Sequence, residues 1–235
     1  MGIETTPSAT AIYRNDGNDT ALALIPEDAR RILDIGCGAG DNARRLGARG
    51  AATQVVGVTW SHAEAEQASR HCAAVHVLDL DRETVRDVGE PFDAILLSHV
   101  LEHLADPPHV LRSLVPLLRP GGCAVIVVPN VLEWRTRLAL AGGRFEYADH
   151  GILDRTHLRF YTYYTAPREL VAPVEGLRLE RVIAKGAAPL GPLRRRILSP
   201  TLRARVDEIA VRRWPNLFAS EVAMLARRVE PPHEA

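Results

Sequence analysis

The sequence predicts an α/β fold in which helices cover both faces of a mostly parallel, seven-stranded sheet. Short apolar runs rich in β-branched residues alternate with helix-length stretches along most of the chain. Strands that are apolar throughout are typical of a sheet buried on both faces. Right-handed crossovers between such strands give a doubly wound sheet and place its ligands beyond the carboxyl ends of the strands.

The strands of the first 130 residues are short and separated by polar or glycine-rich turns. They are predicted at 31–35, 54–58, 74–78, 92–97 and 123–128. Helices are expected at 41–49, 61–71 and 107–118, and a tight turn at 119–122. Ser61 is a suitable N-cap for the second helix. Two later strands, 177–184 and 218–227, are expected to pair antiparallel and end the sheet, so that its last strand is antiparallel.

A single domain is predicted over residues 31–230, because a chain of 235 residues with 46% apolar residues can bury one large core. A helical lead-in is expected over 1–30 and a disordered tail over 231–235. Two segments depart from the alternation of strands and helices. Residues 142–165 are predicted to be a loop rich in aromatic and histidine side chains, and residues 186–216 an insertion rich in proline and arginine.

The charges balance over the whole chain but not locally. Twenty-nine basic residues, of which only Lys185 is lysine, face 29 acidic ones. A neutral chain is not expected to bind nucleic acid or anionic lipid non-specifically. Residues 194–213, however, hold seven arginines against Asp207 and Glu208, a local charge of +5. We hypothesise that this stretch contacts an acidic or phosphate-bearing molecule or a partner surface; the alternative is an ordinary solvated helix face.

The three cysteines are far apart and have no zinc-ligand spacing, which favours a reducing compartment. The amino end lacks the pattern of a signal peptide, and no apolar run approaches the length of a membrane span. We therefore expect a cytoplasmic protein without a membrane span.

A glycine-rich turn follows the first predicted strand and carries the strongest functional signal. Its residues are Asp34, Gly36, Cys37, Gly38 and Gly40. Glycines let the backbone turn sharply and approach a ligand closely. The third glycine follows the second by two residues, whereas dinucleotide sites have three, and Asp34 would repel a pyrophosphate but attract an ammonium group. The turn therefore favours a ligand with an amino-acid end, and disfavours a nicotinamide-dependent oxidoreductase.

With this motif, residues 31–129 resemble the class I S-adenosylmethionine-dependent methyltransferases, whose Rossmann-like fold is the one predicted. In that family the glycine turn holds the methionine part of the cofactor. Asp79 and Leu80 match the third-strand motif that meets the adenine, and the stretch from Phe92 to Leu104 is similar to the fourth-strand motif of ubiquinone-pathway methyltransferases. The resemblance thereby implies cofactor contacts for Ser98 and His99. Residues 151–160 are similar to a bacterial subgroup associated with surface glycans and secondary metabolites.

The second strand departs from the family pattern, because Thr59 stands where an acid usually binds the ribose hydroxyls. A threonine makes one neutral hydrogen bond where a carboxylate makes two charge-assisted ones. Cyclopropane fatty-acid synthases have a similar threonine, so cofactor binding is still expected. Trp60 is a candidate to cover an adenine face; alternatively, it packs against the neighbouring helix.

Methyl transfer to a hydroxyl needs a group that removes a proton, and histidine suits this role near pH 7. We take His157, His150 and His103 as candidate bases or acceptor contacts; structural hydrogen bonds, packing or helix capping are the alternatives. No metal is expected, because the histidines and acids near residue 150 lack compact ligand spacing. Six aromatic residues between Phe145 and Tyr164 suggest a lid over a flat acceptor, or a loop that packs on itself.

The sequence therefore predicts an enzyme that transfers a methyl group from S-adenosylmethionine to a hydroxyl of a small molecule or glycan precursor, leaving S-adenosylhomocysteine. The alternatives are an N- or C-methyltransferase of a small metabolite, and a methyltransferase-like binding subunit that lacks catalysis. A nucleic-acid substrate is not expected, since no base-methylation motif is present.

Overall fold

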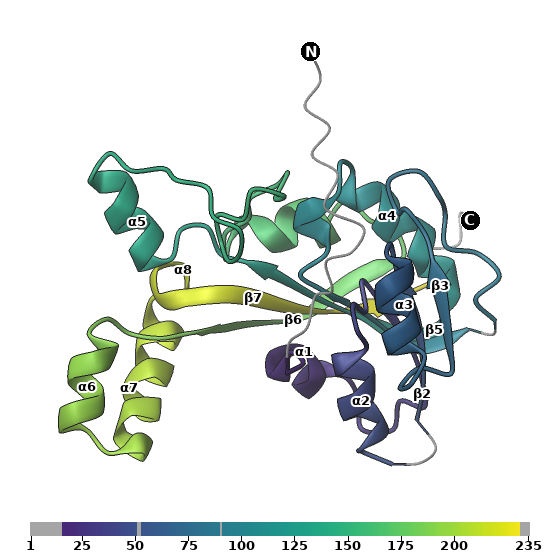
Figure 1. The fold of residues 1–235 in the computed structure, drawn as a ribbon, viewed down its shortest axis with the longest axis horizontal. Coiled ribbons are helices and arrows are strands. Elements are labelled where there is room, and N and C mark those ends of the chain that lie inside the picture. The colour runs from purple at the N-terminus through teal and green to yellow at the C-terminus, as the bar shows by residue number, and fades with distance from the viewer. Residues whose placement is uncertain (1–15, 51–52, 90, 231–235) are drawn as a thin grey trace.

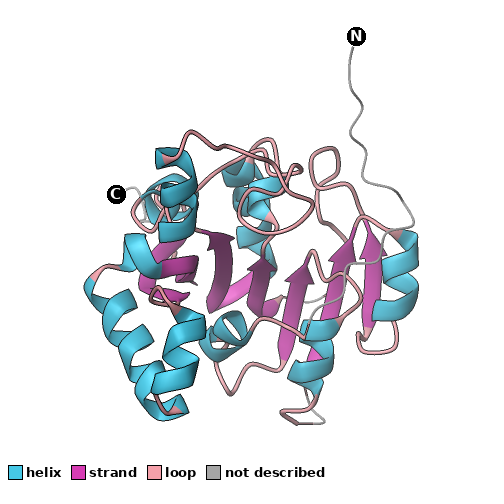
Figure 2. Cartoon of the chain, turned by 60° about the vertical axis from the view of Figure 1, so that its left-hand side comes forward, coloured by secondary structure: helices cyan, strands magenta, loops and turns pink. Residues whose placement is uncertain are grey.

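The structure, a computed structural model, describes residues 16–50, 53–89 and 91–230. These residues form one sheet with the strand order β3-β2-β1-β4-β5-β7-β6 (Figures 1 and 2). The strands are β1 (Arg31–Ile35), β2 (Gln54–Thr59), β3 (Ala74–Val77), β4 (Phe92–Ser98), β5 (Leu118–Pro129), β6 (Leu177–Gly186) and β7 (Ala219–Arg228). Strands β1 to β5 pair in parallel, and β7 is antiparallel to both β5 and β6. The predicted doubly wound sheet with its antiparallel last strand is confirmed.

Helices lie on both faces of this sheet (Figure 2). They are α1 (Asp19–Leu24), α2 (Asp41–Gly47), α3 (His62–Ala68), α4 (Pro107–Leu114), α5 (Trp134–Ala141), α6 (Gly191–Ile197), α7 (Pro200–Arg213) and α8 (Pro215–Phe218). Apolar residues of α1 and α2 pack with Ile32 on one face. Those of α4 pack with Leu33 and Ile35 on the other. Successive residues of β1 thus enter two separate cores, which explains why the strand is apolar almost throughout.

Two local features differ from the expectation. Residues 119–122 belong to β5, which begins at Leu118, so the predicted tight turn before this strand is wrong. The pairing register of β4 with β5 shifts between Phe92 and Ala94. Gly121 and Gly122 lie within this irregularity of β5. Helix α5 has no counterpart in the sequence prediction, because most of its side chains are exposed and it has no clear apolar face.

The predicted helical lead-in contains α1, whose N-cap Asn18 accepts a hydrogen bond from the Ala21 backbone amide at 3.0 Å. Since α1 packs against the sheet, the core begins before Arg31. Residues 1–15 of the lead-in and the predicted tail at 231–235 lie outside the described residues.

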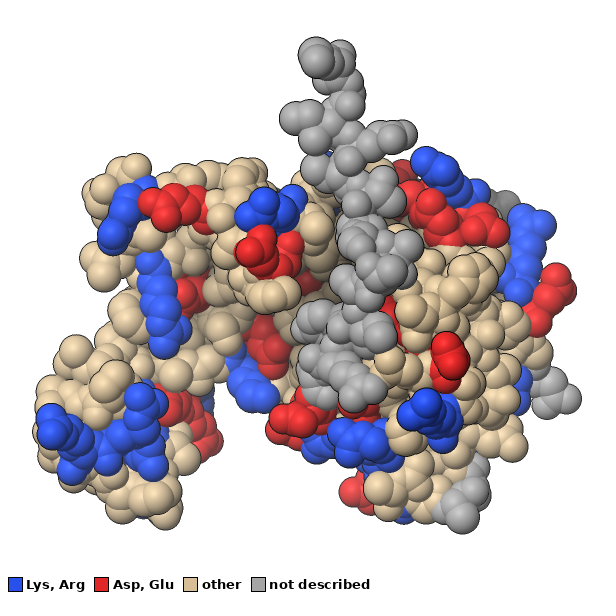
Figure 3. Space-filling model, viewed as in Figure 1, with Lys and Arg blue, Asp and Glu red and all other residues tan. Residues whose placement is uncertain are grey.

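The predicted insertion between β6 and β7 is helical, and we call residues 187–218 the helical arm. Its helices α6 and α7 stand beyond the ends of β6 and β7, away from the rest of the sheet (Figure 1). Several of its arginines gather on the face seen in Figure 3. Asp207 on α7 links this helix to the start of the arm and to α6. It accepts a hydrogen bond from the Ala188 backbone amide at 2.8 Å and pairs with Arg194 at 2.8 Å.

Gly36 shows how closely the backbone must approach after β1. Its φ is +71°, and a Cβ built there would lie 2.3 Å from Cγ2 of Val100. Its backbone amide donates to the Val58 carbonyl at 2.8 Å, and so fixes the turn against β2. Gly121 has a similar φ of +74°, but a Cβ there would meet nothing within 4 Å.

Alanine substitutions at Gly36 and Gly121 separate the cost of a left-handed backbone from the cost of a steric clash. Gly121→Ala should lower the free energy of unfolding by about 1–2 kcal/mol, the cost of a left-handed alanine. Gly36→Ala should lower it by about 1–3 kcal/mol more, because the methyl group also displaces Val100. Urea denaturation of the two variants measures both values, and equal losses would contradict the close approach seen at Gly36.

Candidate functional site

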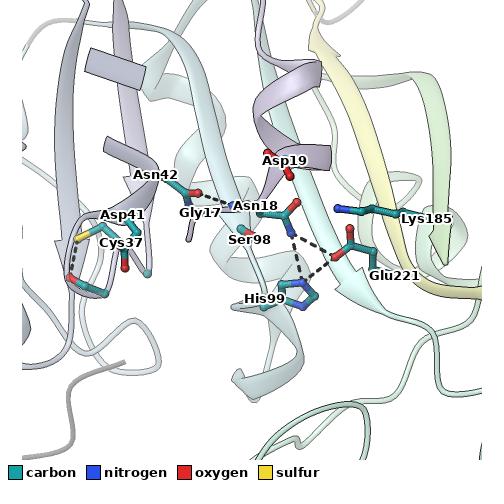
Figure 4. A pocket seen from close by; sticks show the side chains of 12 residues that line it. Gly17, Asn18, Asp19, Cys37, Asp41, Asn42, Ser98, His99, Lys185 and Glu221 are labelled. Atoms are coloured by element: carbon teal, nitrogen blue, oxygen red, sulfur yellow. Dashed lines mark hydrogen bonds and ion pairs between the residues drawn. The ribbon is translucent and has the colours of Figure 1, made fainter. Parts of the chain in front are cut away.

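A pocket of about 270 Å³ opens at the carboxyl ends of β1 and β4 (Figure 4). Five residues predicted to bind cofactor line it: Gly36, Cys37, Gly38, Ser98 and His99. The other lining residues come from the segment before α1, the start of α2, β6 and β7, namely Gly17, Asn18, Asp19, Asp41, Asn42, Lys185 and Glu221. The topology therefore gathers the glycine turn and the end of β4 around one cavity, as expected from the parallel sheet.

Asp34 is a buried carboxylate directly behind this pocket. Its side chain is 1% exposed, and neither carboxylate oxygen has a hydrogen-bond partner among the described residues. Burial raises the pKa of Asp34 to about 7, and the nearby Asn42 amide offsets this effect only in part. Because Asn42 itself lines the pocket, Asp34 lies close enough for a positive group bound there to favour its ionised form.

Gly40 closes the glycine turn as the N-cap of α2, with a φ of +86°. A Cβ at this position would lie 3.0 Å from Cα of Ala68 in α3. The absence of a side chain therefore lets α2 and α3 approach each other beside the pocket.

His99 lines the pocket and links two carboxylates, of which Glu221 is drawn in Figure 4. Its Nδ1 lies 3.3 Å from Oε1 of Glu102, and its Nε2 lies 3.1 Å from Oε2 of Glu221. Burial lowers the pKa of His99, but the two carboxylates outweigh this effect and raise it to about 9. The ring is therefore a cation at neutral pH, held in a left-handed backbone conformation with a φ of +57°.

Glu221 is itself held by residues from the amino end of the described chain. Thr20 donates to its Oε1 at 2.7 Å, and Asn18 Nδ2 donates to its Oε2 at 3.2 Å. Burial raises the pKa of Glu221, but the hydrogen bonds from His99 and Thr20 hold it below its ordinary value. The carboxylate thus fastens α1 to the last strand at the edge of the pocket.

A carboxylate also lies at the end of β2, where the sequence has threonine instead of an acid. The Thr59 hydroxyl donates to Oε2 of Glu64 at 2.5 Å, and both side chains are buried. Glu64 comes from the first turn of α3, where its backbone amide donates to the predicted N-cap Ser61 at 3.4 Å. The helix therefore supplies the acidic group that the strand lacks.

The remaining residues assigned to the adenosine end are more open. Trp60 is 43% exposed and follows Thr59 at the end of β2. Asp79 accepts a hydrogen bond from the Asp81 backbone amide at 3.1 Å and pairs with Arg82 at 3.4 Å. Neither these two residues nor Leu80 lines the pocket, which covers the glycine-turn half of the edge.

Two of the three candidate bases come together beside Glu102, the residue that contacts His99. The rings of His103 and His157 meet edge to face with centroids 4.7 Å apart. Nε2 of His157 lies 4.0 Å from Oε1 of Glu102, and burial lowers the pKa of His157. The third candidate, His150, is exposed and is not part of this cluster.

We call residues 142–165 the aromatic loop. Its second half is attached to the rest of the chain by backbone hydrogen bonds. The backbone amides of Leu158 and Arg159 both donate to the Glu102 carbonyl, at 2.8 and 3.0 Å. Tyr161 is buried in the core, whereas Phe145 and Tyr147 are about half exposed and stack edge to face. Tyr161 therefore ties the second half of the loop to the core, while Phe145 and Tyr147 in the first half and Tyr164 near the end of the loop expose their rings.

Several pocket residues carried no local signal in the sequence. Glu221 reaches the site through the antiparallel pairing of β7, and Asn18 through the packing of α1. Lys185 lines the pocket from β6. It is the only lysine in the sequence, and this was the only signal that set it apart. Glu64 could have been found from its position three residues after a helix N-cap, where acidic side chains are common.

A family model described as a methyltransferase domain matches residues 12–162. The chain belongs to this family, the class I S-adenosylmethionine-dependent methyltransferases. The ubiquinone biosynthesis O-methyltransferase of Brucella anthropi is 34% identical over 164 residues, which cover 66% of this chain and 62% of the relative. The match thus spans less than two thirds of that protein.

Solved structures share the fold at lower identity. An S-adenosylmethionine dependent methyltransferase from Mesorhizobium loti superposes with a TM-score of 0.58 and 21% identity, covering 89% of this chain and 96% of that chain. The [4+2]-cyclase SpnF does so with a TM-score of 0.54 and 20% identity, covering 92% and 85%. These likenesses show the fold alone, and the cyclase illustrates that the fold does not fix the reaction. Across the described ranges, no helix combines the length and the apolar character that crossing a membrane requires.

The buried Asp34 carboxylate should make the stability of the chain depend on pH. Its folded pKa of about 7 lies above the ordinary value of 3.8, so the folded state binds the proton more tightly than the unfolded state. The destabilisation is therefore absent below about pH 4 and grows as pH rises to 7, towards about 4 kcal/mol. Asp34→Asn should unfold at a higher urea concentration than the wild type at pH 8, with a smaller difference at pH 5. A gain that does not depend on pH would contradict the raised pKa.

Proposed function

We propose that the chain transfers the methyl group of S-adenosylmethionine to a hydroxyl of a small molecule or glycan precursor. The observation that carries the proposal is the buried, unpartnered Asp34 carboxylate behind a glycine turn in which a side chain at Gly36 would collide with Val100. Family membership and the distant similarity to ubiquinone biosynthesis O-methyltransferases support it.

The residues present fit the amino-acid end of the cofactor. An ammonium group near Asp34 would supply the positive charge that this carboxylate lacks, since burying an unpaired charge is costly. The glycine turn lets the ligand approach the backbone, with Ser98 and the His99 cation on the opposite wall. When bound, S-adenosylmethionine supplies an electrophilic methyl group on a sulfonium and is left as S-adenosylhomocysteine.

The adenosine end would follow the edge of the sheet towards β2 and β3. We assign the ribose hydroxyls to Thr59 and Glu64, because a buried carboxylate accepts charge-assisted hydrogen bonds where threonine alone cannot. Asp79 and Leu80 follow β3 and are assigned to the adenine. Trp60 is exposed enough to cover its face.

The acceptor would enter from the side of the aromatic loop, where Phe145 and Tyr147 expose their rings. We assign the acceptor proton to the group of His103, His157 and Glu102, which adjoins the pocket through the contact of Glu102 with His99. Much of the acceleration of an in-line displacement can come from alignment, about 7–11 kcal/mol at best. The cluster has only to hold the hydroxyl in line and weaken its O–H bond.

The cofactor assignment predicts a specific dependence of affinity on pH. A cation bound beside Asp34 favours the ionised carboxylate, so binding releases a proton below pH 7. Titration calorimetry should show S-adenosylhomocysteine binding the wild type more tightly as pH rises from 6 to 8. Asp34→Asn should bind about tenfold more weakly at pH 8, with little pH dependence. An affinity of the wild type that stays constant over this range would count against the pairing.

The reaction itself is tested with cofactor carrying an isotopically labelled methyl group. The chain is incubated with panels of phenols, alcohols and sugar derivatives, and labelled products are identified by mass. An O-methylated product supports the proposal. Products methylated only on nitrogen or carbon would replace it with the corresponding transfer. Tight cofactor binding without any product from a broad panel would favour a non-catalytic binding subunit.

For the helical arm, we propose that its exposed arginines contact an acidic or phosphate-bearing acceptor. Arg194 is excluded from this role, because it pairs with Asp207 at 2.8 Å and donates to the Ala188 and Pro189 carbonyls. Arg195 and Arg196 are exposed on α6.

Replacing both Arg195 and Arg196 with alanine should raise KM for an acidic acceptor at least threefold and leave kcat and Tm unchanged. The matched lysine variant should keep most of the affinity, because it keeps the charge. Arg194→Ala should instead lower Tm. Unchanged kinetics in the double alanine variant would show that the arm does not contact the acceptor.

A further inference from the structure

Glu102, His103 and His157 form a compact group of potential metal ligands next to the cofactor pocket. One ligand atom from each residue lies within 4.8 Å of the others. Glu102 and His103 lie in the short turn after β4, and His157 comes from the aromatic loop. His99 borders both the pocket, which it lines, and the group, since its Nδ1 lies 3.3 Å from Oε1 of Glu102. Histidines 54 residues apart in the sequence are thus brought face to face.

The hydrogen bonds that His103 makes with described residues involve Nδ1 and leave Nε2 available for a ligand. Its Nδ1 lies 3.0 Å from Oγ1 of Thr156 and 3.3 Å from the Thr156 carbonyl oxygen. The Thr156 hydroxyl donates its one proton to Oδ1 of Asp154 at 2.7 Å. It can therefore only accept from His103, and the proton of a neutral His103 ring lies on Nδ1. The lone pair of the ring is then on Nε2.

His157 is oriented in the same way by a different partner. Its Nδ1 lies 3.1 Å from the Ile152 carbonyl oxygen, which can only accept. Its Nε2 is the ring nitrogen nearest to Glu102. Histidines that bind metals almost always donate their second ring nitrogen to a carbonyl or a carboxylate, because this fixes the tautomer and the ring orientation. Both rings already have this arrangement.

Glu102 supplies an independent observation. Its side chain is fully buried, and its Oε2 has no hydrogen-bond partner among the residues that the structure describes. Its Oε1 is the atom that contacts His99 and faces His157. A buried carboxylate oxygen without a partner is costly, and a cation beside it would remove this cost.

We propose that Glu102, His103 and His157 bind one divalent transition-metal ion, and that Zn²⁺ is the ion the donor set fits best. Two imidazole nitrogens and one carboxylate are a known set for zinc sites that keep a coordination position open. Zinc bonds of 2.0–2.1 Å place ligand atoms about 3.3 Å apart, so rotation of the side chains must bring the most distant pair together by about 1.5 Å. The expectation of no metal, drawn from sequence spacing, is replaced by this proposal.

The ion would have two consequences. It would tie the aromatic loop to the end of β4, adding to the backbone hydrogen bonds that Leu158 and Arg159 make with Glu102. Its open position would take an acceptor hydroxyl and lower the pKa of that hydroxyl; this second role rests on the proposed function. A ligated His157 has no lone pair left on Nε2, so metal binding and direct base catalysis by His157 exclude each other.

Metal binding is measured on the full chain without a histidine tag, after removal of metal by a chelator and without cofactor or acceptor. Competition with a chromophoric chelator should show one equivalent of Zn²⁺ bound with micromolar or tighter affinity. His157→Ala and Glu102→Gln should each weaken binding about 100-fold or more. Thr156→Val keeps all three ligands but removes the hydroxyl that orients His103, and should weaken binding about tenfold.

The matched control is His109→Ala on α4, which removes an exposed histidine and should bind Zn²⁺ like the wild type. Because Glu102 is buried, thermal unfolding of each variant is followed in parallel. Zn²⁺ should raise Tm for the wild type and for His109→Ala, and should leave Tm unchanged for His157→Ala, whose substitution lies in a loop.

The absorption spectrum of Co²⁺ bound in place of Zn²⁺ shows which kinds of ligand atom hold the metal. Visible bands without an intense thiolate charge-transfer band in the near ultraviolet are expected; such a thiolate band would show binding at a cysteine and overturn the proposal. Lack of stoichiometric binding, or equal binding by His157→Ala, would also overturn it. A chain that transfers methyl groups but holds no metal would keep the proposed function and lose this inference. A chain that binds Zn²⁺ through these residues but binds no S-adenosylhomocysteine would keep this inference and lose the proposed function.

Discussion

The ion pairs of His99 with Glu102 and Glu221 are the interaction on which the site depends. Three parts of the chain that are far apart in sequence meet there: the end of β4, the last strand and, through Thr20 and Asn18, helix α1. A cation between the buried Glu102 and the largely buried Glu221 balances charges that would be costly to bury alone. His99 lines the pocket and also contacts Glu102 of the histidine cluster, so the same contacts position both.

The sequence was sufficient for the sheet and for the residues of the glycine turn, because both depend on local patterns. Apolar runs mark strands buried on two faces, and Asp34 with its glycines is contiguous. It was insufficient for Glu221 and Asn18, which reach the pocket through strand pairing and helix packing. Helix α5 was missed, and the helical arm was predicted as an insertion with a solvated helix face only as an alternative, because the apolar residues of both segments are largely exposed. His103 and His157 were both recognised, but only the folded loop brings them together.

Two of the carboxylates at this edge are left incompletely satisfied, and they lie at opposite ends of the site. Asp34 stands behind the glycine turn, and Glu102 stands beneath the histidines. At Asp34, whose two oxygens both lack a partner among the described residues, stability alone would favour an amide. At Glu102 the His99 ring pairs with Oε1, and only Oε2 lacks such a partner. The two positive groups proposed above, an ammonium beside Asp34 and a metal ion beside Glu102, would each meet one of these oxygens.

The anchoring of the aromatic loop also bears on how this architecture can change. Tyr161 pairs with Asn130, and the backbone amides of Leu158 and Arg159 donate to the Glu102 carbonyl, so the backbone of residues 158–161 is tied to the core. Residues 142–150 carry exposed rings and few such bonds. Exchange of that short stretch between related chains would diversify this exposed surface while His103 and His157 stay in place. For the proposed methyl transfer, acceptor range would then be separable, in evolution or in the laboratory, from the chemistry beneath the loop.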